Sequence, residues 1–266
     1  MKRFLLCILF PVLVTGQELS VFKTVGKDSI TLNLANHLYG PTEITVQPVE
    51  ELADRIVIVK PNFVLQARDS SRVASIPLHL IPNKDSMRWD HFFSLKAILG
   101  DPENAKHNTD YRYALPYPKG KKYKIVQGFN GNFTHNTVKS RYAIDFDLRI
   151  GDTICAAREG VVVRTKDHFK EHGGKEFISK ANLITILHDD GTLAAYVHLD
   201  YKGVLVKPGD YVEKGQPIGI SGLTGFTRGP HLHFVVREAR DVSVPIYFEG
   251  YEKKIIKKGK KYVRKK

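Results

Sequence analysis

Short runs in which apolar and polar residues alternate recur along most of the chain. Between residues 17 and 100 they include SITLNLAN, TEITVQ, DRIVIVK, NFVLQAR and RVASIPLHL, separated by Gly, Pro, Asn and Asp. A period of two residues is that of a half-buried β-strand, and turn signals about every eight to twelve residues are typical of a small β-sandwich. The pattern therefore predicts a β-sandwich-like domain over residues 17–100, which holds no candidate catalytic cluster.

The alternation stops at residues 101–120, which are polar and interrupted by proline, and this composition favours a linker or an extended wrap. It resumes over residues 121–245 with runs such as YKIVQGF, RYAIDFDL, NLITILHDD, LAAYVHLD and HLHFVVRE. No run keeps the 3.6-residue period of an amphipathic helix. The whole chain is thus predicted to be all-β, with an antiparallel sheet in the second region.

The first sixteen residues, MKRFLLCILFPVLVTG, have a different character. Two basic residues precede a short apolar core, and small residues follow it, which is the layout of a secretory signal and too short for a membrane span. Residues 1–16 are therefore expected to be a signal peptide that directs export to the periplasm or the cell exterior. Cleavage would leave Cys155 as the remaining cysteine, so an internal disulfide is excluded and a core or a metal must stabilise the chain.

Charge adds one further feature. The chain has a formal net charge of +13, and its end, EKKIIKKGKKYVRKK, is strongly basic. Residues 246–266 are predicted to form a basic C-terminal tail. In an exported protein such a tail meets anionic cell-wall or envelope polymers, so no nucleic-acid partner is expected. The alternative is a solvated tail without a partner.

The candidate chemistry lies in the second region. In RGPHLHFVVRE, His231 and His233 are two residues apart, so a strand places both imidazoles on one face, whereas a helix would separate them by about 200°. Asp145 lies between two apolar residues of another predicted strand, where an unpaired carboxylate would need a cation or metal beside it. His198 follows a third strand. A hydrolytic zinc site needs three protein ligands, and further imidazoles can move protons or stabilise an oxyanion.

The order and spacing of these runs resemble the lysostaphin/LytM-type zinc metallopeptidases. The resemblance rests on RYAIDFDL, GDTICAAREGVVV, NLITILHDDGTLAAYVHL, VKPGDYVEKGQPIGISGLTG and GPHLHFVVRE, and it covers roughly residues 120–240. That family cuts peptide cross-bridges or stem peptides of bacterial peptidoglycan. The resemblance implies one Zn²⁺ ion, Asp145 and His233 as ligands, His198 and His231 as catalytic histidines, and peptidoglycan peptides as the substrate.

One position departs from the family pattern. The first ligand histidine commonly lies four residues before the aspartate, where this chain has Arg141, and arginine cannot bind zinc. His135 is the nearest upstream candidate, so it is predicted to be the third ligand, with residues 136–140 as a looped-out excursion. The alternative is an exposed His135 and a degenerate site. The chain would then be a non-catalytic relative that binds the cell wall or activates another hydrolase.

Other residues are weaker candidates. His188 precedes the turn signal DDG and is expected at the surface. Asp147 is expected behind the ligands or in solvent, His168 and His172 are expected beside the cleft, and Cys155 is expected to be a small buried residue. The glycine-containing segments GFNGNF (128–133) and SGLTGFTRGPH (221–231) are predicted to line the substrate groove. A biotinyl- or lipoyl-type carrier, suggested by GVLVKPGDYVEKGQPIG, has no use for paired histidines.

Overall fold

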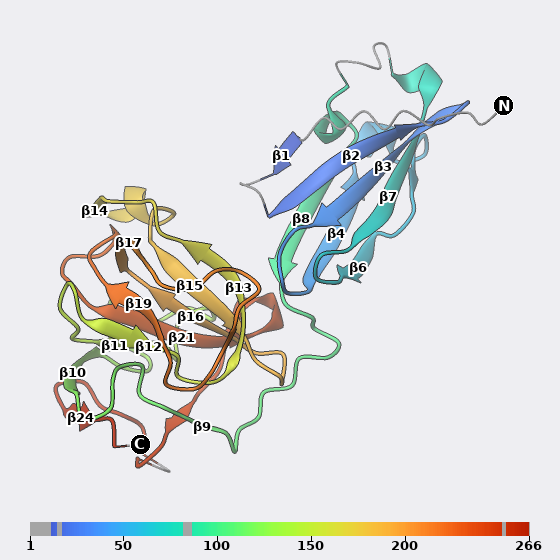
Figure 1. Cartoon of the computed structure of the whole chain (residues 1–266). Helices are drawn as coiled ribbons and strands as arrows, with labels where there is room; N and C mark the ends of the chain where they lie inside the picture. The colour runs from blue at the N-terminus through green and yellow to red at the C-terminus, as the bar shows by residue number, and fades with distance from the viewer. Residues whose placement is uncertain (1–11, 15–17, 82–86, 252–253, 266) are drawn as a thin grey trace. The chain divides into compact units, whose positions relative to one another are not determined.

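The protein is all-β, as the sequence predicts. The computed structural model describes residues 12–14, 18–81, 87–251 and 254–265, which form strands and short 3-10 turns but no α-helix (Figure 1). The chain divides into two compact units, residues 1–101 and 102–266. Most of the expected signal segment lies outside the described residues, although Val12–Val14 pair with the following strand. Nowhere in the described ranges is there a helix long and apolar enough to cross a membrane.

Unit 1 consists of two antiparallel sheets that share one hydrophobic core. The first has the order β1-β2-β3-β7-β5 and the second the order β6-β4-β8. In β3, alternate residues are buried, which places Ile30, Leu32 and Leu34 in the core. The strands are β1 (Val12–Val14), β2 (Leu19–Val25), β3 (Ser29–Asn36), β4 (Thr42–Pro48), β5 (Val57–Ile58), β6 (Asn62–Leu65), β7 (Ser70–Pro77) and β8 (Phe93–Leu99). Its 3-10 turns are η1 (Glu50–Leu52), η2 (Leu78–Leu80) and η3 (Trp89–His91).

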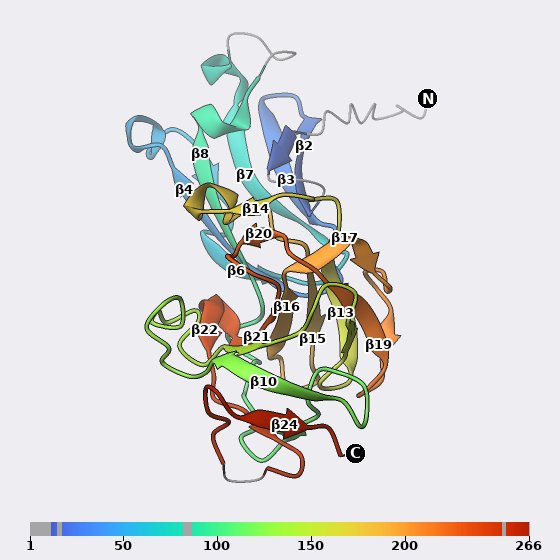
Figure 2. The same ribbon diagram turned by 90° about the vertical axis from the view of Figure 1, so that its left-hand side faces the viewer.

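Unit 2 is built on one large antiparallel sheet with the order β18-β13-β15-β16-β21-β11-β10-β24, and β22 extends it beside β21 (Figure 2). Its strands are β10 (Lys122–Gln127), β11 (Ile144–Phe146), β13 (Gly160–Lys166), β15 (Leu183–Leu187), β16 (Leu193–Val197), β18 (Tyr211–Val212), β21 (Leu232–Glu238), β22 (Val242–Ser243) and β24 (Lys261–Val263). Small sheets flank it: β12 (Thr153–Cys155), β19 (Pro217–Ser221) and β17 (Leu199–Val204); β14 (His172–Gly173) with β20 (Gly225–Phe226); and β9 (Arg112–Tyr113) with β23 (Tyr247–Phe248). Two 3-10 turns, η4 (Lys175–Phe177) and η5 (Ala239–Asp241), complete it.

The register of β21 determines what the sheet presents at one end. On one side His233 lies opposite Asp145 of β11, and on the other side it lies opposite Val197 of β16. His198 follows Val197 directly. Three residues that are far apart in sequence are therefore brought together by backbone pairing alone.

The segment predicted as a linker or a wrap is wrapped onto unit 2. Tyr113, Leu115 and Tyr117 are almost fully buried in its core, and β9 pairs with β23. The hydroxyl of Tyr117 donates to the backbone oxygen of Tyr262 at 2.8 Å. The linker alternative does not describe residues 102–120, because their spaced aromatic residues supply core side chains within an otherwise polar sequence.

The basic C-terminal segment is also part of the fold rather than a free tail. Strand β24 pairs with β10, β23 pairs with β9, and Phe248 and Ile256 are buried. A free tail was expected because residues 246–266 are strongly basic. A few apolar residues among them nevertheless point into the core. Burial of those residues anchors the segment.

The expectation that His188 lies at the surface is wrong. The side chain is 3% exposed, its Nδ1–H donates to the Glu159 carbonyl at 2.7 Å, and the ring contacts the edge of Tyr113. Burial lowers the pKa of His188 to about 4, because the charged imidazolium is poorly solvated there. The histidine is therefore neutral in the folded protein at neutral pH.

This burial predicts an acid-dependent loss of stability. The folded pKa of about 4 lies below the unfolded value of 6.5, so the unfolded chain takes up the proton first as the pH falls. Above about pH 7 the titration of His188 does not change the free energy of unfolding. As the pH falls from 6.5 to 4, the titration lowers this free energy by about 3 kcal/mol in total. His188→Asn, which keeps a donor for the Glu159 carbonyl, should flatten the acid side of a pH series of urea unfolding. The exposed His172→Asn serves as the control, and equal pH slopes in both variants would contradict the assignment.

Candidate metal centre

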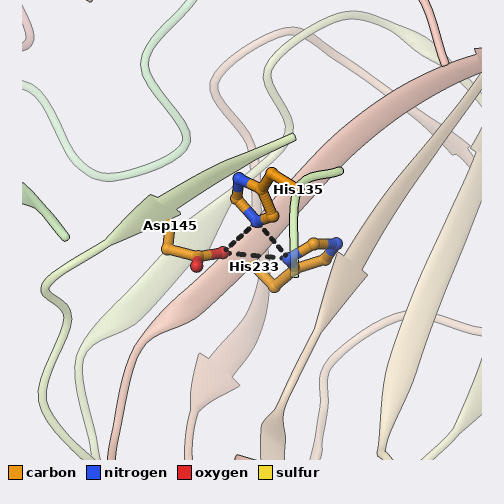
Figure 3. Close-up of side chains that lie close together, drawn as sticks. All are labelled: His135, Asp145 and His233. Carbon is orange, nitrogen blue, oxygen red and sulfur yellow. Dashed lines mark hydrogen bonds and ion pairs between the residues drawn. The ribbon is translucent and has the colours of Figure 1, made fainter. Parts of the chain in front are cut away.

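Three side chains of unit 2 converge on one point (Figure 3). His135 follows β10 on a loop, Asp145 lies in β11 and His233 in β21. His135 Nε2 lies 3.2 Å from Asp145 Oδ1 and 3.3 Å from His233 Nδ1, and the third side, from His233 Nδ1 to Asp145 Oδ1, is 2.9 Å. The structure thus brings together the three residues that the sequence singles out as ligands.

The donor set fits a tetrahedral divalent ion. Bonds of about 2.0–2.1 Å at the tetrahedral angle separate two ligand atoms by about 3.3 Å, close to all three sides of the observed triangle. His135 Nδ1–H donates to the Gly128 carbonyl at 3.0 Å, which leaves Nε2 with its lone pair toward the centre. Two imidazoles and one carboxylate suit zinc, and three protein donors leave the fourth position to a non-protein ligand.

The ionisation of Asp145 and His233 also favours metal binding. Burial alone would raise the pKa of Asp145, but hydrogen bonds with His135 and then His233 outweigh it, and the pKa lies well below its usual range. Burial lowers the pKa of His233, which favours the neutral ring. An ionised carboxylate and neutral imidazoles are the forms that bind a metal.

Two further histidines lie beside the triangle, as predicted for the catalytic pair. The rings of His198 and His231 are 4.7 Å apart, and His231 Nε2 lies 3.8 Å from Asp145 Oδ1. His198 Nδ1–H donates to the Thr224 carbonyl at 2.6 Å, and His231 Nδ1–H donates to the Gly229 carbonyl at 2.9 Å. In the neutral form of each ring, Nδ1 therefore carries the proton and Nε2 is left as the acceptor.

Residues that the sequence did not single out hold this arrangement in place. The Gln127 amide donates to Asp145 Oδ2 at 3.0 Å and to the Thr134 hydroxyl, and so ties the His135 loop to the carboxylate. The fully buried Asn182 accepts the backbone N–H of His198 on its backbone carbonyl, and its own N–H donates to the Thr224 hydroxyl. Strand alternation could have indicated that Gln127 faces inward, whereas backbone carbonyl partners leave no sequence signature.

The backbone conformation of His198 is unusual. The residue has a φ of 70°, in the left-handed region that residues other than glycine rarely adopt. Hydrogen bonds from its own N–H to Asn182 and from its ring to Thr224 secure that conformation. Burial also lowers the pKa of His198 to about 3, with a further contribution from the neighbouring His231.

The weaker candidates lie away from the triangle. Arg141 is exposed and its guanidinium covers the ring of Tyr142, so it does not block the metal position. Asp147 is exposed 3.9 Å from Lys124. His168 and His172 are exposed, and His172 of β14 lies opposite Gly225 of β20, next to Phe226. Cys155 is buried, which raises the pKa of its thiol.

The two predicted groove walls meet beside the histidines. Phe133 of the first segment and Phe226 of the second have ring centres 6.2 Å apart, and the Arg228 guanidinium lies 4.9 Å from the centre of the Phe133 ring. Each wall also reaches the site through its backbone, since the carbonyls of Gly128 and Gly229 accept from His135 and His231. A hollow of about 490 Å³ adjoins residues 127–133 and 255–258.

Comparison with known families identifies the domain that contains this site. Residues 139–245 match the model of Peptidase family M23. The chain carries an M23 peptidase domain. The resemblance to lysostaphin/LytM-type metallopeptidases is thereby confirmed. The matched range contains Asp145, His198, His231 and His233 but begins after His135, so the assignment of that ligand rests on the geometry described above.

Individual relatives are similar over a little under half of this chain. An uncharacterized metalloprotease of Buchnera aphidicola is 39% identical over 125 residues, which cover 46% of this chain and 30% of the relative. The peptidoglycan DD-endopeptidase ShyA of Vibrio cholerae is 35% identical over 44% of this chain and 26% of its own length, and lysostaphin of Staphylococcus staphylolyticus is 34% identical over 49% and 24%. The chain thus spans about a quarter to a third of these relatives.

Among solved structures, the lysostaphin catalytic domain from Staphylococcus simulans is similar at 27% identity. The alignment covers 53% of this chain and 95% of that one, with a TM-score of 0.33.

The position of Gln127 predicts a measurable effect on metal affinity. Partners that orient a metal-binding carboxylate typically contribute about 10–100-fold in affinity, so Gln127→Ala should weaken zinc binding by that factor. Competition with a chromophoric chelator measures it without any enzymatic assay. Asn136→Ala removes an exposed amide on the same loop, which donates to the Asn132 carbonyl, and should leave the affinity unchanged. Equal affinities in the two variants would contradict the role of Gln127.

Proposed function

We propose that the protein is a zinc-dependent metallo-endopeptidase that hydrolyses cross-links or stem peptides of bacterial peptidoglycan. The observation that carries this proposal is the triangle of donor atoms from His135, Asp145 and His233, with His198 and His231 beside it. All of these except His135 lie within the residues that match the M23 model. The names of the relatives support the substrate class, since they include peptidoglycan DD-endopeptidases and lysostaphin.

The residues of the site have two roles, metal binding and proton transfer. His135, Asp145 and His233 would hold one zinc ion, which when bound supplies a Lewis acid that polarises a carbonyl and favours deprotonation of water. His198 and His231 present Nε2 as a proton acceptor because each donates Nδ1–H to a carbonyl of residues 224–229. A ring that takes the proton of the attacking water becomes an imidazolium, whose Nε2–H can donate to the developing oxyanion. The pair can thereby supply both the general base and the oxyanion stabiliser.

The competing function is that of a non-catalytic relative that binds the wall or activates another hydrolase. Its support was Arg141 at the position of the usual first ligand. In the structure Arg141 is exposed, whereas His135 Nε2 lies 3.2 Å from Asp145 Oδ1 and the His135 side chain is fully buried, which supports His135 as the third ligand. The geometry therefore favours the enzyme.

Two substitutions separate ligand from catalyst. His233→Ala removes a donor atom and should abolish both stoichiometric zinc and cleavage. His198→Ala leaves the triangle intact, so it should retain zinc and lose at least about 100-fold in turnover. Elemental analysis and digestion of purified peptidoglycan, with identification of the released fragments, measure the two effects. Normal digestion by both variants would refute the proposed mechanism.

The same proposal requires export, because peptidoglycan lies outside the cytoplasm. Residues 1–16 have the layout of a signal peptide. Expression in a bacterial host followed by fractionation should recover the chain outside the cytoplasm, with Gln17 as its first residue. Replacement of Phe4–Val14 by a polar sequence should hold the full-length chain in the cytoplasm, and unchanged export would contradict the assignment.

A further inference from the structure

A strongly basic surface lies at one edge of the unit 2 sheet. Residues 117–126 and 254–265 contain ten lysines and Arg264 but no acidic residue. Strands β10 and β24 of these segments lie side by side, with Lys122 opposite Val263 and Lys124 opposite Lys261 (Figure 2). We call these two segments the basic ribbon.

The basic ribbon is a fixed framework rather than a mobile tail. Tyr251 donates its hydroxyl to the Val263 carbonyl at 3.0 Å and accepts from the Val263 N–H at 2.9 Å. Arg264 donates to the carbonyl of Tyr117, whose own hydroxyl reaches Tyr262. Lysine side chains on a fixed backbone lose less conformational freedom on binding than lysines on a disordered tail.

One pair of like charges in the ribbon opposes the stability of the sheet. Lys124 and Lys261 are directly opposite, and such a pair destabilises a sheet. Asp147 lies 3.9 Å from Lys124, but it offsets little of the repulsion between the two lysines because the side chains of Asp147 and Lys124 are both about half exposed. The adjoining hollow of about 300 Å³ is lined by Lys121, Lys122, Tyr123, Lys124, Asp147, Arg149, Asp152 and Lys261. An anionic ligand bound in this hollow would relieve the repulsion between the lysines that line it.

We propose that the basic ribbon is an exosite that holds the carboxylates of the peptidoglycan polymer while a neighbouring peptide is cut, an inference that rests on the proposed function. Strand β10 links the two places: Gln127 at its end contacts Asp145, and Lys124 is three residues earlier, about 10 Å along the strand. A polymer with repeated stem-peptide carboxylates can therefore occupy both places at once.

The side chains of the ribbon argue against a nucleic acid or a membrane as its ligand. Lysines are point charges that attract carboxylates and phosphates alike, whereas recognition of single-stranded bases uses exposed aromatic rings for stacking. The tyrosines of the ribbon pack on one another or on the adjacent Tyr251, with ring centres 4.8 Å apart for Tyr117 and Tyr123 and 5.0 Å apart for Tyr251 and Tyr262. Ile255 and Val126 are exposed, but two separated aliphatic residues do not make the broad apolar face of a membrane-binding element.

The test compares two triple variants with equal loss of charge. Lys122→Gln/Lys124→Gln/Lys261→Gln neutralises the ribbon, and Lys27→Gln/Lys60→Gln/Lys96→Gln neutralises exposed lysines of unit 1. Both are made in the full chain carrying His198→Ala, so that binding to purified peptidoglycan sacculi is measured by co-sedimentation without digestion. The ribbon variant should bind about tenfold more weakly at low salt and lower the slope of log affinity against log salt by about 2–3. The unit 1 variant should bind as the parent does, and equal loss in both variants would overturn the proposal.

Chemical treatment of the sacculi identifies the ligand. Amidation of their carboxyl groups with carbodiimide and ethanolamine should abolish ribbon-dependent binding, whereas removal of phosphodiester polymers with hydrofluoric acid should leave it unchanged. The reverse pattern would overturn the carboxylate assignment. Tighter ribbon-dependent binding to phosphatidylglycerol vesicles or to single-stranded DNA than to sacculi would also overturn it.

Turnover in the otherwise unaltered enzyme separates this inference from the proposed function. The ribbon variant should digest sacculi about tenfold more slowly at low salt and cleave a short soluble peptide containing the scissile bond at the parent rate. Equal losses on both substrates would overturn the exosite. If no form of the protein cuts either substrate, the peptidase is rejected, and the binding comparison above still decides whether the ribbon holds sacculi. Circular dichroism should show that both triple variants remain folded, since every substituted lysine is exposed.

Discussion

The buried carboxylate of Asp145 is the constraint on which the rest of unit 2 depends. An ionised carboxylate that is 5% exposed costs several kcal/mol unless cations or donors surround it. Strand pairing brings His233 to one side of it, the loop after β10 brings His135 to the other, and the Gln127 amide satisfies the second oxygen. The neighbouring backbone is arranged around one charge, and a divalent cation is the natural counterpart of that charge.

Much of this site could be predicted because its chemistry follows strand periodicity. Two histidines at a spacing of two, and an aspartate between Ile144 and Phe146, indicate a shared face and a buried charge from the order of residues alone. His135 needed a different argument, since Arg141 holds the usual position and the intervening residues are looped out. The turn is closed by local hydrogen bonds such as those from the N–H groups of Ser140 and Arg141 to the Thr137 carbonyl.

The features that the sequence did not reveal have a common physical cause. The carbonyls of Thr224 and Gly229 act through the backbone, which any residue type could supply. His188 and the tyrosines of residues 102–120 lie in polar surroundings in the sequence, and tertiary packing decides their burial. The charge of residues 246–266 suggested a free tail because composition does not reveal that a few inward residues, such as Ile256, anchor many outward lysines.

The loop of residues 224–229 supports both His198 and His231, because each ring donates to one of its carbonyls. The two rings are thereby mechanically linked. A displacement of this loop, whether by substitution or by a peptide pressing on Phe226, turns both imidazoles together. A new cleavage preference that arises through that wall must therefore preserve two hydrogen-bond directions at once. The opposite wall, at Phe133, is tied to the metal-binding residues instead, through the Gly128 carbonyl and the Gln127 side chain.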